Sequence, residues 1–365
     1  MPTLTKLITL MGILFTSIIF GQNQLSNPER NFEYLWDLFD QKYANFEQKN
    51  HNWDDTYNIY RAKVTQKTTD MELFNIFKDM LKPLNDAHVK LTAPSIDAKF
   101  SARKPSKILA ELSSVKNIRT SMHEMTDNTL NKLGFTSIKE IGPKYKGNKL
   151  FAYSNNDKTG YLRFHRSASK IIFGMPIDSP FLNKQLEKIF KSFKQLETLI
   201  IDIRFNIGGN DEFVNKIVGR LIEEEFLAYY KQEKLNKNQF GPLRAISVKP
   251  QGKSKFLKKV YLLTNDLTVS AADVFTLMIQ QLPNSTIVGD HSNGSFSDIL
   301  SKKLPNGWGI NLSNERYFSV DMKNHEGSGV PVDVYAHTTL KDIKDKSDSV
   351  LLQTFALIEA ANHTP

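Results

Sequence analysis

The chain has 365 residues, of which 40% are hydrophobic and 24% are charged, and its formal net charge is +9. A chain of this length and composition can bury a full core, which excludes a fibrous or wholly disordered protein. The sequence contains no cysteine, so disulfide bonds and lipid attachment at a cysteine are both excluded. The lysines are scattered rather than gathered on one periodic face. The positive charge therefore indicates a solvated surface and no nucleic-acid partner.

The first 21 residues have the pattern of an export signal. Lys6 precedes an uncharged, largely apolar run from Leu7 to Phe20, and Gly21 follows that run. A positive residue, an apolar run and a small residue are typical of a cleaved signal peptide. The run is shorter than the roughly 20 apolar residues that a membrane-spanning helix needs. We predict that residues 1–21 are a signal peptide of a periplasmic or secreted protein with no stable membrane span, with an uncleaved anchor as the alternative.

Residues 22–94 are predicted to form a helical N-terminal domain. Asn27-Pro28-Glu29 offers a cap, a proline at the first helical position and an early acid. Thr69 and Glu72 have the spacing of a capping box, which predicts the start of a third helix. Apolar residues recur at helical spacing in three stretches, which include Phe32 to Tyr43, Trp53 to Val64, and Leu73 to Leu84.

The rest of the chain divides into three parts. Residues 95–157 are polar and basic, and we predict a linker or small subdomain with short helices and strands. From residue 158 to 345, apolar β-rich runs alternate with helical patterns, and residues 346–365 are predicted as a C-terminal helix or tail. Strands that alternate with helices indicate βαβ units. The predicted fold class is therefore α/β, a helical domain followed by a βαβ domain with a mainly parallel sheet.

The predicted strands and helices of the α/β part lie at regular intervals. Thr198–Arg204 is a continuous apolar run, as expected of a buried parallel strand. Leu304-Pro305-Asn306-Gly307 has the composition of a hairpin turn. The remaining expected elements are strands at 160–164, 260–264, 286–289 and 308–312, and helices over residues 213–222 and 274–282.

Ser270 is a candidate nucleophile, because it lies between a predicted buried strand and a predicted helix. At a helix N-terminus a hydroxyl is close to the positive end of the helix dipole and to free backbone N–H groups. Such groups can stabilise an oxyanion. Serine is also a common helix cap, and this segment alone favours that role.

A pair of glycines, Gly208 and Gly209, follows the predicted strand that contains Asp202. Without a Cβ atom, their backbone amides can approach a ligand closely. The segment matches neither a Walker nor a dinucleotide-binding pattern, so it indicates an anion cradle or a tight turn and no nucleotide site.

His88 follows the third predicted helix, in Asp86-Ala87-His88. The pKa of histidine lies near neutral pH, which makes this residue a candidate general base, although in isolation a surface or capping role fits it better. None of the eight histidines has the HExxH spacing of a zinc peptidase. The sequence implies neither a metal nor an organic cofactor.

Taken together and in order, these segments resemble one protein family. The motifs are Asp86-Ala87-His88, Gly160-Tyr161, Asp202 to Gly209, Ser270 to Asp273, and Glu326-Gly327-Ser328-Gly329 to Asp333. They are similar to the D-x-H, G-Y, D-x-R-x-N-x-G-G, S-A-x-E and E-G-x-G-x-x-x-D motifs of the tricorn-core and C-terminal-processing serine peptidases. That family has a fold related to Clp protease and crotonase, and the similarity spans about residues 30 to 340.

The resemblance implies a role for each matched residue. Ser270 corresponds to the nucleophile, His88 to the general base of the tricorn branch, and Glu326 to an acid that orients the polar network of the site. The backbone amides of Gly208 or Gly209 and of Ala271 correspond to the oxyanion hole. A serine hydroxyl is a poor nucleophile until a base removes its proton, so this set is chemically coherent.

Three departures from the family pattern distinguish this chain. The processing branch pairs its serine with a lysine in a T-x-G-K turn, and Ser295 stands at that position here. We therefore expect a Ser–His–Glu arrangement and no serine–lysine dyad. The tricorn branch has a serine immediately before its histidine, where this chain has Ala87, and an acidic residue after its nucleophile, where this chain has Ala271.

The predicted function is serine-type hydrolysis of peptide bonds in exported or extracellular polypeptides. The predicted site lies in the cleft between the two domains, with His88 from the first domain and Ser270 from the second. The alternative is a non-catalytic carrier of apolar ligands, because a retinoid-binding relative uses the same fold. An esterase or lipase is disfavoured because the residues around Ser270 lack a G-x-S-x-G elbow. Substrate sequence preference and oligomeric state are not predicted.

Overall fold

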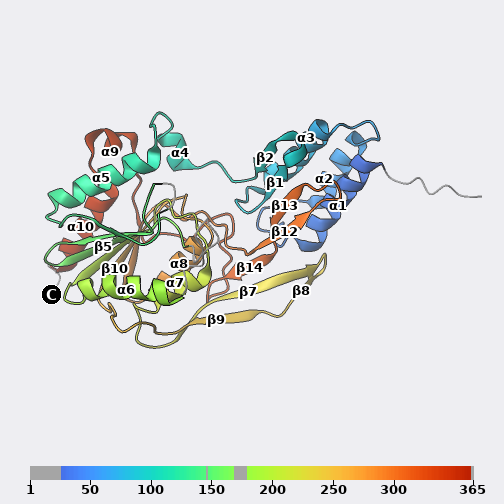
Figure 1. The fold of residues 1–365 in the computed structure, drawn as a ribbon. Coiled ribbons are helices and arrows are strands. Elements are labelled where there is room, and N and C mark those ends of the chain that lie inside the picture. Colours follow the sequence, from blue (N-terminus) through green and yellow to red (C-terminus); the bar gives the residue numbers. More distant parts are fainter. Residues whose placement is uncertain (1–25, 145–146, 168–178, 363–365) are drawn as a thin grey trace, which may run out of the picture.

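Two lobes make up the molecule, and several segments of the chain run between them (Figure 1). The structure is a computed structural model that describes residues 26–144, 147–167 and 179–362. The predicted signal peptide lies outside these residues. We call the lobe that contains the first three helices the helical lobe, and the lobe that contains the long central sheet the sheet lobe.

The helical lobe begins with the three predicted helices. These are α1 (Asn27–Lys42), α2 (Trp53–Tyr60) and α3 (Asp70–Leu81). Three short 3₁₀ turns accompany them, η1 (Arg61–Lys63), η2 (Lys82–Leu84) and η3 (Pro94–Ile96). The capping box of Thr69 and Glu72 is confirmed. The cap of α1 is Ser26 and not Asn27, because the Ser26 hydroxyl and Glu29 close a capping box of their own.

The helical lobe also contains a sheet that joins distant parts of the chain. Strands β1 (Lys90–Ala93) and β2 (Ala98–Ser101) pair with β12 (Ile299–Lys303) and β13 (Gly309–Ser313) in the order β12-β13-β1-β2. The predicted hairpin turn at Leu304–Gly307 connects β12 to β13. It carries Trp308 into the core of the helical lobe, where the indole packs edge-on against Phe74 and Phe77. The hairpin thus anchors the later half of the chain to the first three helices.

The sheet lobe is built on a seven-stranded sheet of order β15-β11-β10-β6-β5-β4-β3. Its five neighbouring strands from β15 to β5 are parallel, and β4 and β3 are antiparallel, which confirms the mainly parallel α/β class. The bounds are β3 (Lys139–Ile141), β4 (Phe151–Asn155), β5 (Thr159–Arg163), β6 (Thr198–Asp202), β10 (Lys259–Thr264), β11 (Ser285–Gly289) and β15 (Val334–Tyr335).

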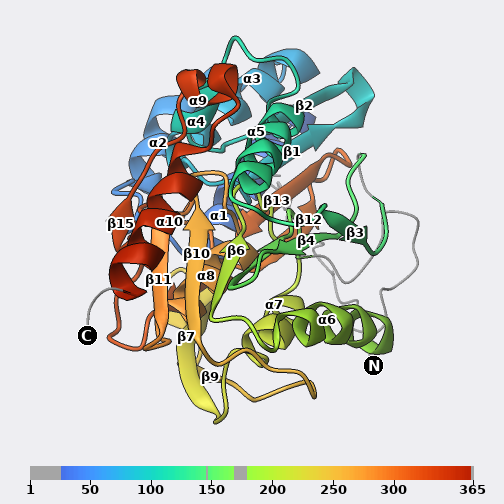
Figure 2. The same ribbon diagram turned by 90° about the vertical axis from the view of Figure 1, so that its left-hand side faces the viewer.

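Helices cover both faces of this sheet (Figures 1 and 2). Alternate residues of each strand point to opposite faces. Leu162, Ile201 and Leu262 pack with α6 (Ser179–Phe193), α7 (Asp211–Val218) and α8 (Ala271–Ile279). Tyr161, Ile200 and Leu263 pack with α5 (Ile118–Lys132) and α10 (Ser349–Asn362). The short helices α4 (Lys107–Glu111) and α9 (Leu340–Asp345) flank the second layer.

The segment 95–157, predicted as a linker or small subdomain with short helices and strands, contributes to the sheet lobe. It contains the 15-residue helix α5 and two strands of the central sheet, β3 and β4. Their composition is polar because α5 is partly exposed and β3 lies at the sheet edge. The polar composition of this segment thus reflects the partial exposure of α5 and β3.

A long arm built on one extended strand also connects the lobes. Strand β7 (Phe226–Asn236) pairs with β8 (Gln239–Phe240), β9 (Arg244–Val248) and β14 (Glu315–Phe318). Its tip reaches the helical lobe, where the Lys42 ammonium donates to the carbonyl of Leu235 at 2.7 Å and Lys237 pairs with Asp40 at 3.1 Å. The arm therefore fixes the helical lobe against the sheet lobe.

Candidate active site

Ser270 lies at the sharp turn between β10 and α8, as the cap residue of that helix. Its backbone has φ of 66° and ψ of −127°. A residue other than glycine in this region carries strain of about 1–3 kcal/mol and persists only where the surroundings impose it. The backbone N–H of Ser270 donates to the carboxylate of Asp273 at 2.7 Å, which holds the turn. Ser270 is half-buried, so its side chain retains access to solvent.

Gly208 packs directly against Ser270. The φ of Gly208 is +79°, and a Cβ atom built on it would lie 2.5 Å from the Ser270 Cβ and 2.5 Å from the Val269 carbonyl oxygen. A side chain at position 208 would overlap these atoms. Glycine therefore allows the backbone of this turn to lie in close contact with Ser270. The Val269 N–H donates to the Asn206 carbonyl at 2.9 Å and fixes the two turns together.

The backbone amides beside Ser270 differ in their hydrogen bonding. The Gly208 N–H donates to the side-chain oxygen of Asn206 at 2.9 Å. Within residues 26–144, 147–167 and 179–362, the N–H groups of Gly209 and Ala271 have no hydrogen-bond acceptor. Gly209 is exposed, and the Ala271 nitrogen would lie 3.0 Å from a Cβ on Gly208. The open donors at this turn are therefore those of Gly209 and Ala271.

The polar residues of the strand that leads to the glycines have structural partners. The Arg204 guanidinium pairs with Asp202 at 2.6 Å and with Asp348 at 2.7 Å, and all three side chains are buried. The Asn206 amide donates to the Phe164 carbonyl at 2.9 Å while its oxygen accepts from Gly208. These contacts hold the end of β6 and shape the glycine turn.

His88 comes from the helical lobe and is buried, with 3% of its surface exposed. Burial lowers the pKa of His88 below its usual value, with the nearby cations Lys90 and Arg103 acting in the same direction and Asp86 and Asp298 opposing them. The imidazole is therefore neutral at neutral pH. Its Nδ1 atom is buried without a hydrogen-bond partner, and in the described part of the chain no hydrogen bond joins His88 to Ser270 or Glu326.

Ser295 and Asp273 link the segment of His88 to the turn of Ser270 through hydrogen bonds. The Ala87 N–H donates to the Ser295 hydroxyl at 3.4 Å. The Ser295 N–H donates at 3.1 Å to the same Asp273 oxygen that accepts from the Ser270 N–H. The carboxylate of Asp273 is fully buried, and burial raises its pKa. Ser295, at the position of the lysine in the processing branch, thus docks the helical lobe against the loop that supports Ser270.

Glu326 lies at the same boundary between the lobes and pairs with the helical lobe. Its carboxylate accepts from the Phe296 N–H at 3.0 Å and lies 3.2 Å from the Lys49 ammonium, and both charged side chains are buried. Burial raises the pKa of Glu326 to about 7, and the charge of Asp86 adds to the effect while Lys49 opposes it. Tyr43 donates to Asp86 at 3.0 Å and completes this buried polar cluster.

The sequence motifs identified Ser270, His88, Glu326 and the backbone positions Gly208, Gly209 and Ala271, which the contacts above link into one region. The motifs did not indicate three neighbouring residues, Lys49, Tyr43 and Ser295. Tyr43 ends the first helix and was predicted only as a core position, Lys49 lies in the turn that follows, and Ser295 was noted only as the replacement of a lysine. The signal that could have identified Lys49 is weak, because one lysine among many carries no pattern.

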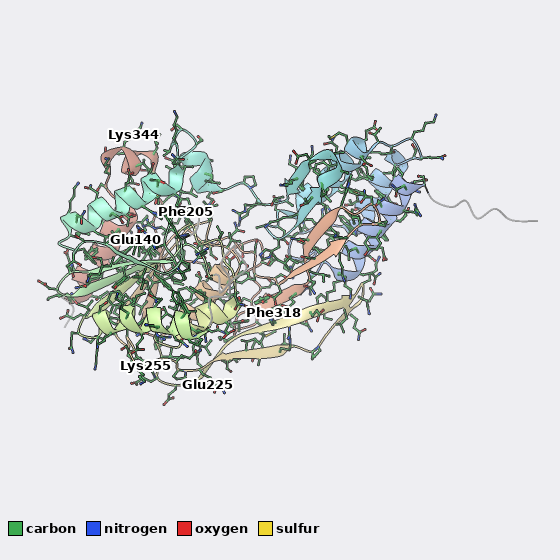
Figure 3. The ribbon with its side chains drawn as sticks, viewed as in Figure 1. Glu140, Phe205, Glu225, Lys255, Phe318 and Lys344 are labelled. Carbon is green, nitrogen blue, oxygen red and sulfur yellow. The ribbon has the colours of Figure 1, made fainter. Side chains whose placement is uncertain are left out.

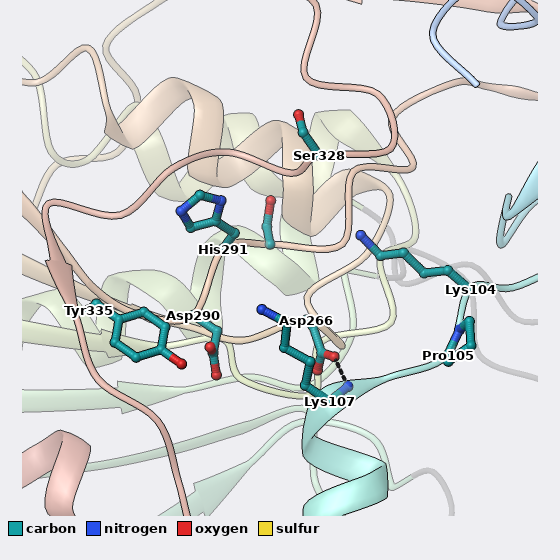
Figure 4. A pocket seen from close by; sticks show the side chains of 9 residues that line it. Lys104, Pro105, Lys107, Asp266, Asp290, His291, Ser328 and Tyr335 are labelled. Atoms are coloured by element: carbon teal, nitrogen blue, oxygen red, sulfur yellow. Dashed lines mark hydrogen bonds between the residues drawn. The ribbon is translucent and has the colours of Figure 1, made fainter. Parts of the chain in front are cut away.

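A polar cavity of about 240 Å³ lies where the segment that joins β2 to α4 passes the loops that follow β10 and β11 (Figure 4). The Asp266 carboxylate accepts from the Ser106 hydroxyl at 3.0 Å and from the Lys107 N–H, which ties this segment to the sheet lobe. Neither Ser270 nor His88 lines this cavity. Among the described residues, no three histidine, aspartate or glutamate side chains are grouped to hold a metal ion, and no helix is long and apolar enough to cross a membrane.

Both lobes resemble known peptidases. Residues 158–336 match the model of peptidase family S41, and residues 26–82 match that of the tricorn protease C1 domain. A candidate peptidase from Parabacteroides merdae is 27% identical, with a TM-score of 0.75, and the match covers 91% of this chain and 96% of that one.

Two further solved structures share the fold at low sequence identity. Mature CPAF in complex with lactacystin is 13% identical, with a TM-score of 0.64 and coverage of 90% of this chain and 97% of that one. The tricorn protease is 15% identical, with a TM-score of 0.55, and the match covers 92% of this chain but 37% of that one. Residues 158–336 thus form a peptidase domain of the S41 type, and the two family models together with the order of the motifs show that the chain is a serine-type peptidase.

Proposed function

We propose that the protein hydrolyses peptide bonds of exported polypeptides, with Ser270 as the nucleophile and His88 as the general base. The observation that carries this proposal is the turn of Ser270, a strained serine packed against a glycine pair with two open amide donors beside it. A helix cap alone requires neither the strain nor the close glycine. Both features are what a nucleophile beside an oxyanion hole needs.

The proposed reaction begins when the Ser270 hydroxyl attacks the carbonyl carbon of the scissile bond and passes its proton to His88. The oxyanion that forms would accept hydrogen bonds from the N–H groups of Gly209 and Ala271, with Gly208 supporting the turn. The protonated His88 then donates its proton to the leaving amine, and a water molecule hydrolyses the acyl-enzyme by the reverse sequence. The lowered pKa of His88 supports this role, because only the neutral imidazole can accept a proton.

Glu326 is assigned a positioning role in this proposal. It is paired with Lys49 and not with His88, so it would act through the boundary between the lobes and would hold the segment of Asp86 to His88 near the nucleophile. No hydrogen bond joins His88 to Ser270 among the described residues, so the proposed proton transfer requires these two side chains to come together when substrate binds.

The experiment that tests the proposal is hydrolysis of unfolded casein by the purified mature protein. Ser270→Ala and His88→Ala should each lower the cleavage rate by at least about a thousandfold. Ser328→Ala, at an exposed serine of the neighbouring loop, is the matched control and should cleave like the parent. Equal rates for the parent and Ser270→Ala would refute the assignment of the nucleophile.

Labelling with a fluorophosphonate separates the enzyme from the alternative of an apolar-ligand carrier. The parent should form a covalent adduct that Ser270→Ala does not form. A parent that neither cleaves casein nor reacts with the probe would favour the carrier. Export is tested separately, by locating the protein after cell fractionation and sequencing its mature N-terminus, which we expect to begin at Gln22.

A further inference from the structure

A second pocket, of about 350 Å³, opens beside the turn of Ser270 on the side of α4 and α5. Figure 3 shows Phe205, one of its walls, on the part of the sheet lobe that faces these two helices. The residues that line the pocket are Arg103, Leu109, Asn117, Ile118, Arg119, Thr120, Asn148, Phe205, Ile207 and Leu267.

The inner wall of the pocket is continuous with the nucleophile turn. The Asn265 side-chain oxygen accepts from the Phe205 N–H at 3.3 Å and from the Leu267 N–H at 3.0 Å, so one side chain joins the two walls. Ile207 is the residue before Gly208, and Gly208 packs against Ser270. When the carbonyl carbon of a bound peptide lies at Ser270, a side chain of that peptide next to the scissile bond can therefore reach the pocket.

The chemistry of the lining is apolar with a basic rim. Leu109 and Ile207 are each about two-fifths exposed, at 41%, while Phe205 and Leu267 are buried beneath them. Exposed apolar side chains over a buried apolar floor favour an apolar occupant. The charged residues of the lining are Arg103 and Arg119, and no carboxylate is among the lining residues described. A lysine or arginine side chain would meet like charge there.

From this arrangement we propose that the pocket selects the substrate by accepting one large apolar side chain, such as leucine, methionine or phenylalanine, next to the scissile bond. The volume is at the lower end of the ~300–1,000 Å³ of ligand pockets, which suits a single side chain and not an extended ligand. Helices α4 and α5, from the segment between the two family-model matches, form the outer wall. The proposal rests on the proposed peptidase activity and adds a substrate class to it.

The test is digestion of a proteome-derived peptide library by the mature protein, with the cleaved bonds identified by mass spectrometry. Leucine, methionine and phenylalanine should be enriched at one fixed position beside the bond, and lysine and arginine should be depleted there. For matched peptides, kcat/KM with leucine at that position should exceed kcat/KM with alanine by at least about tenfold.

Two variants assign that preference to the pocket. Leu109→Trp fills the pocket from an exposed position and should bring the leucine-to-alanine ratio close to one, with alanine peptides still cleaved. Leu352→Trp, at an equally exposed leucine of α10, is the matched control and should keep the parent ratio. Arg103→Glu should raise the cleavage of lysine peptides relative to leucine peptides by about tenfold.

The possible results separate the two proposals. The proposed role of the pocket would be wrong if cleavage depended on Ser270 but showed no fixed apolar position. It would also be wrong if neither Leu109→Trp nor Arg103→Glu changed the preference. In both cases the proposed peptidase function would still stand. A parent that cleaves no peptide of the library would overturn the proposed function and the pocket with it.

Discussion

Replacement of Gly208 by alanine tests the close packing on which the proposed nucleophile site depends. The new Cβ would lie 2.5 Å from both the Ser270 Cβ and the Val269 carbonyl oxygen, and both atoms belong to a rigid turn. The left-handed backbone at Gly208 adds about 1 kcal/mol of strain for an alanine, and relief of the overlap adds about 1–3 kcal/mol. We expect Gly208→Ala to lower the free energy of unfolding by about 2–4 kcal/mol.

Activity should fall further than stability alone explains. The overlap can be relieved only by moving the glycine turn away from Ser270, and a displacement near 1 Å lowers catalytic rates by about a hundredfold. The assay is the initial rate of casein cleavage for the fraction that remains folded, together with urea unfolding followed by fluorescence.

Gly134→Ala provides the matched control. Gly134 has nearly the same φ, +78°, but a Cβ atom there would meet nothing within 4 Å. This variant should show the strain of about 1 kcal/mol and an unchanged cleavage rate. If Gly208→Ala cleaved casein within threefold of Gly134→Ala and unfolded at the same urea concentration, the close packing against Ser270 would be wrong.

Two further variants test the buried charges. Glu326→Gln should change the pH dependence of stability. Burial raises the pKa of Glu326 from 4.5 to about 7. Between these two pH values the folded state therefore keeps a proton on Glu326 that the unfolded state releases. The stability of the parent should therefore fall relative to Glu326→Gln as the pH rises from about 4.5 to 7, by on the order of 3 kcal/mol, and a constant difference in urea unfolding would contradict this. Asp348→Asn should lower the free energy of unfolding by about 3 kcal/mol, because it removes a buried partner of Arg204, whereas Asp345→Asn at an exposed helical pair should change it by less than about 0.5 kcal/mol.

The sequence was most informative where structure depends on neighbouring residues. The capping box at Thr69 and Glu72, the buried run at Thr198–Arg204 and the turn at Leu304–Gly307 all form the predicted elements, because caps, continuous apolar runs and turn composition act over a few residues. The α/β class followed from the alternation of these elements.

Long-range pairing could not be predicted in the same way. The hairpin of β12 and β13 pairs with β1, some 200 residues earlier in the chain, and no local pattern records that choice of partner. The arm of β7 was not predicted either, because this partly exposed strand mixes apolar residues with two lysines and a glutamate, and the arm makes its contacts with both lobes.

The candidate site shows the same division between local and distant information. The motifs identified Ser270, His88, Glu326 and the glycine pair, because each stands in a short pattern of its own. The motifs did not indicate that Glu326 pairs with Lys49, which lies in the other lobe and carries no pattern. The assignment of catalytic roles remains a proposal that the variants above test.

The contacts between the lobes explain why a catalytic site can form across them. Ser270 and the glycine pair are held entirely within the sheet lobe, so the nucleophile turn does not depend on the helical lobe for its shape. The proposed base is different, because His88 belongs to the helical lobe and its position depends on how that lobe docks.

Three kinds of contact fix that docking. The ion pair of Lys49 with Glu326 and the hydrogen bond of Lys104 to the Gly327 carbonyl hold one loop, while the Ala87 N–H reaches Ser295 beside it. The arm of β7 adds ties at its far end. Loss of one contact should therefore shift His88 slightly and leave the fold intact, which would reduce the rate of peptide cleavage without abolishing reaction of Ser270 with a small probe.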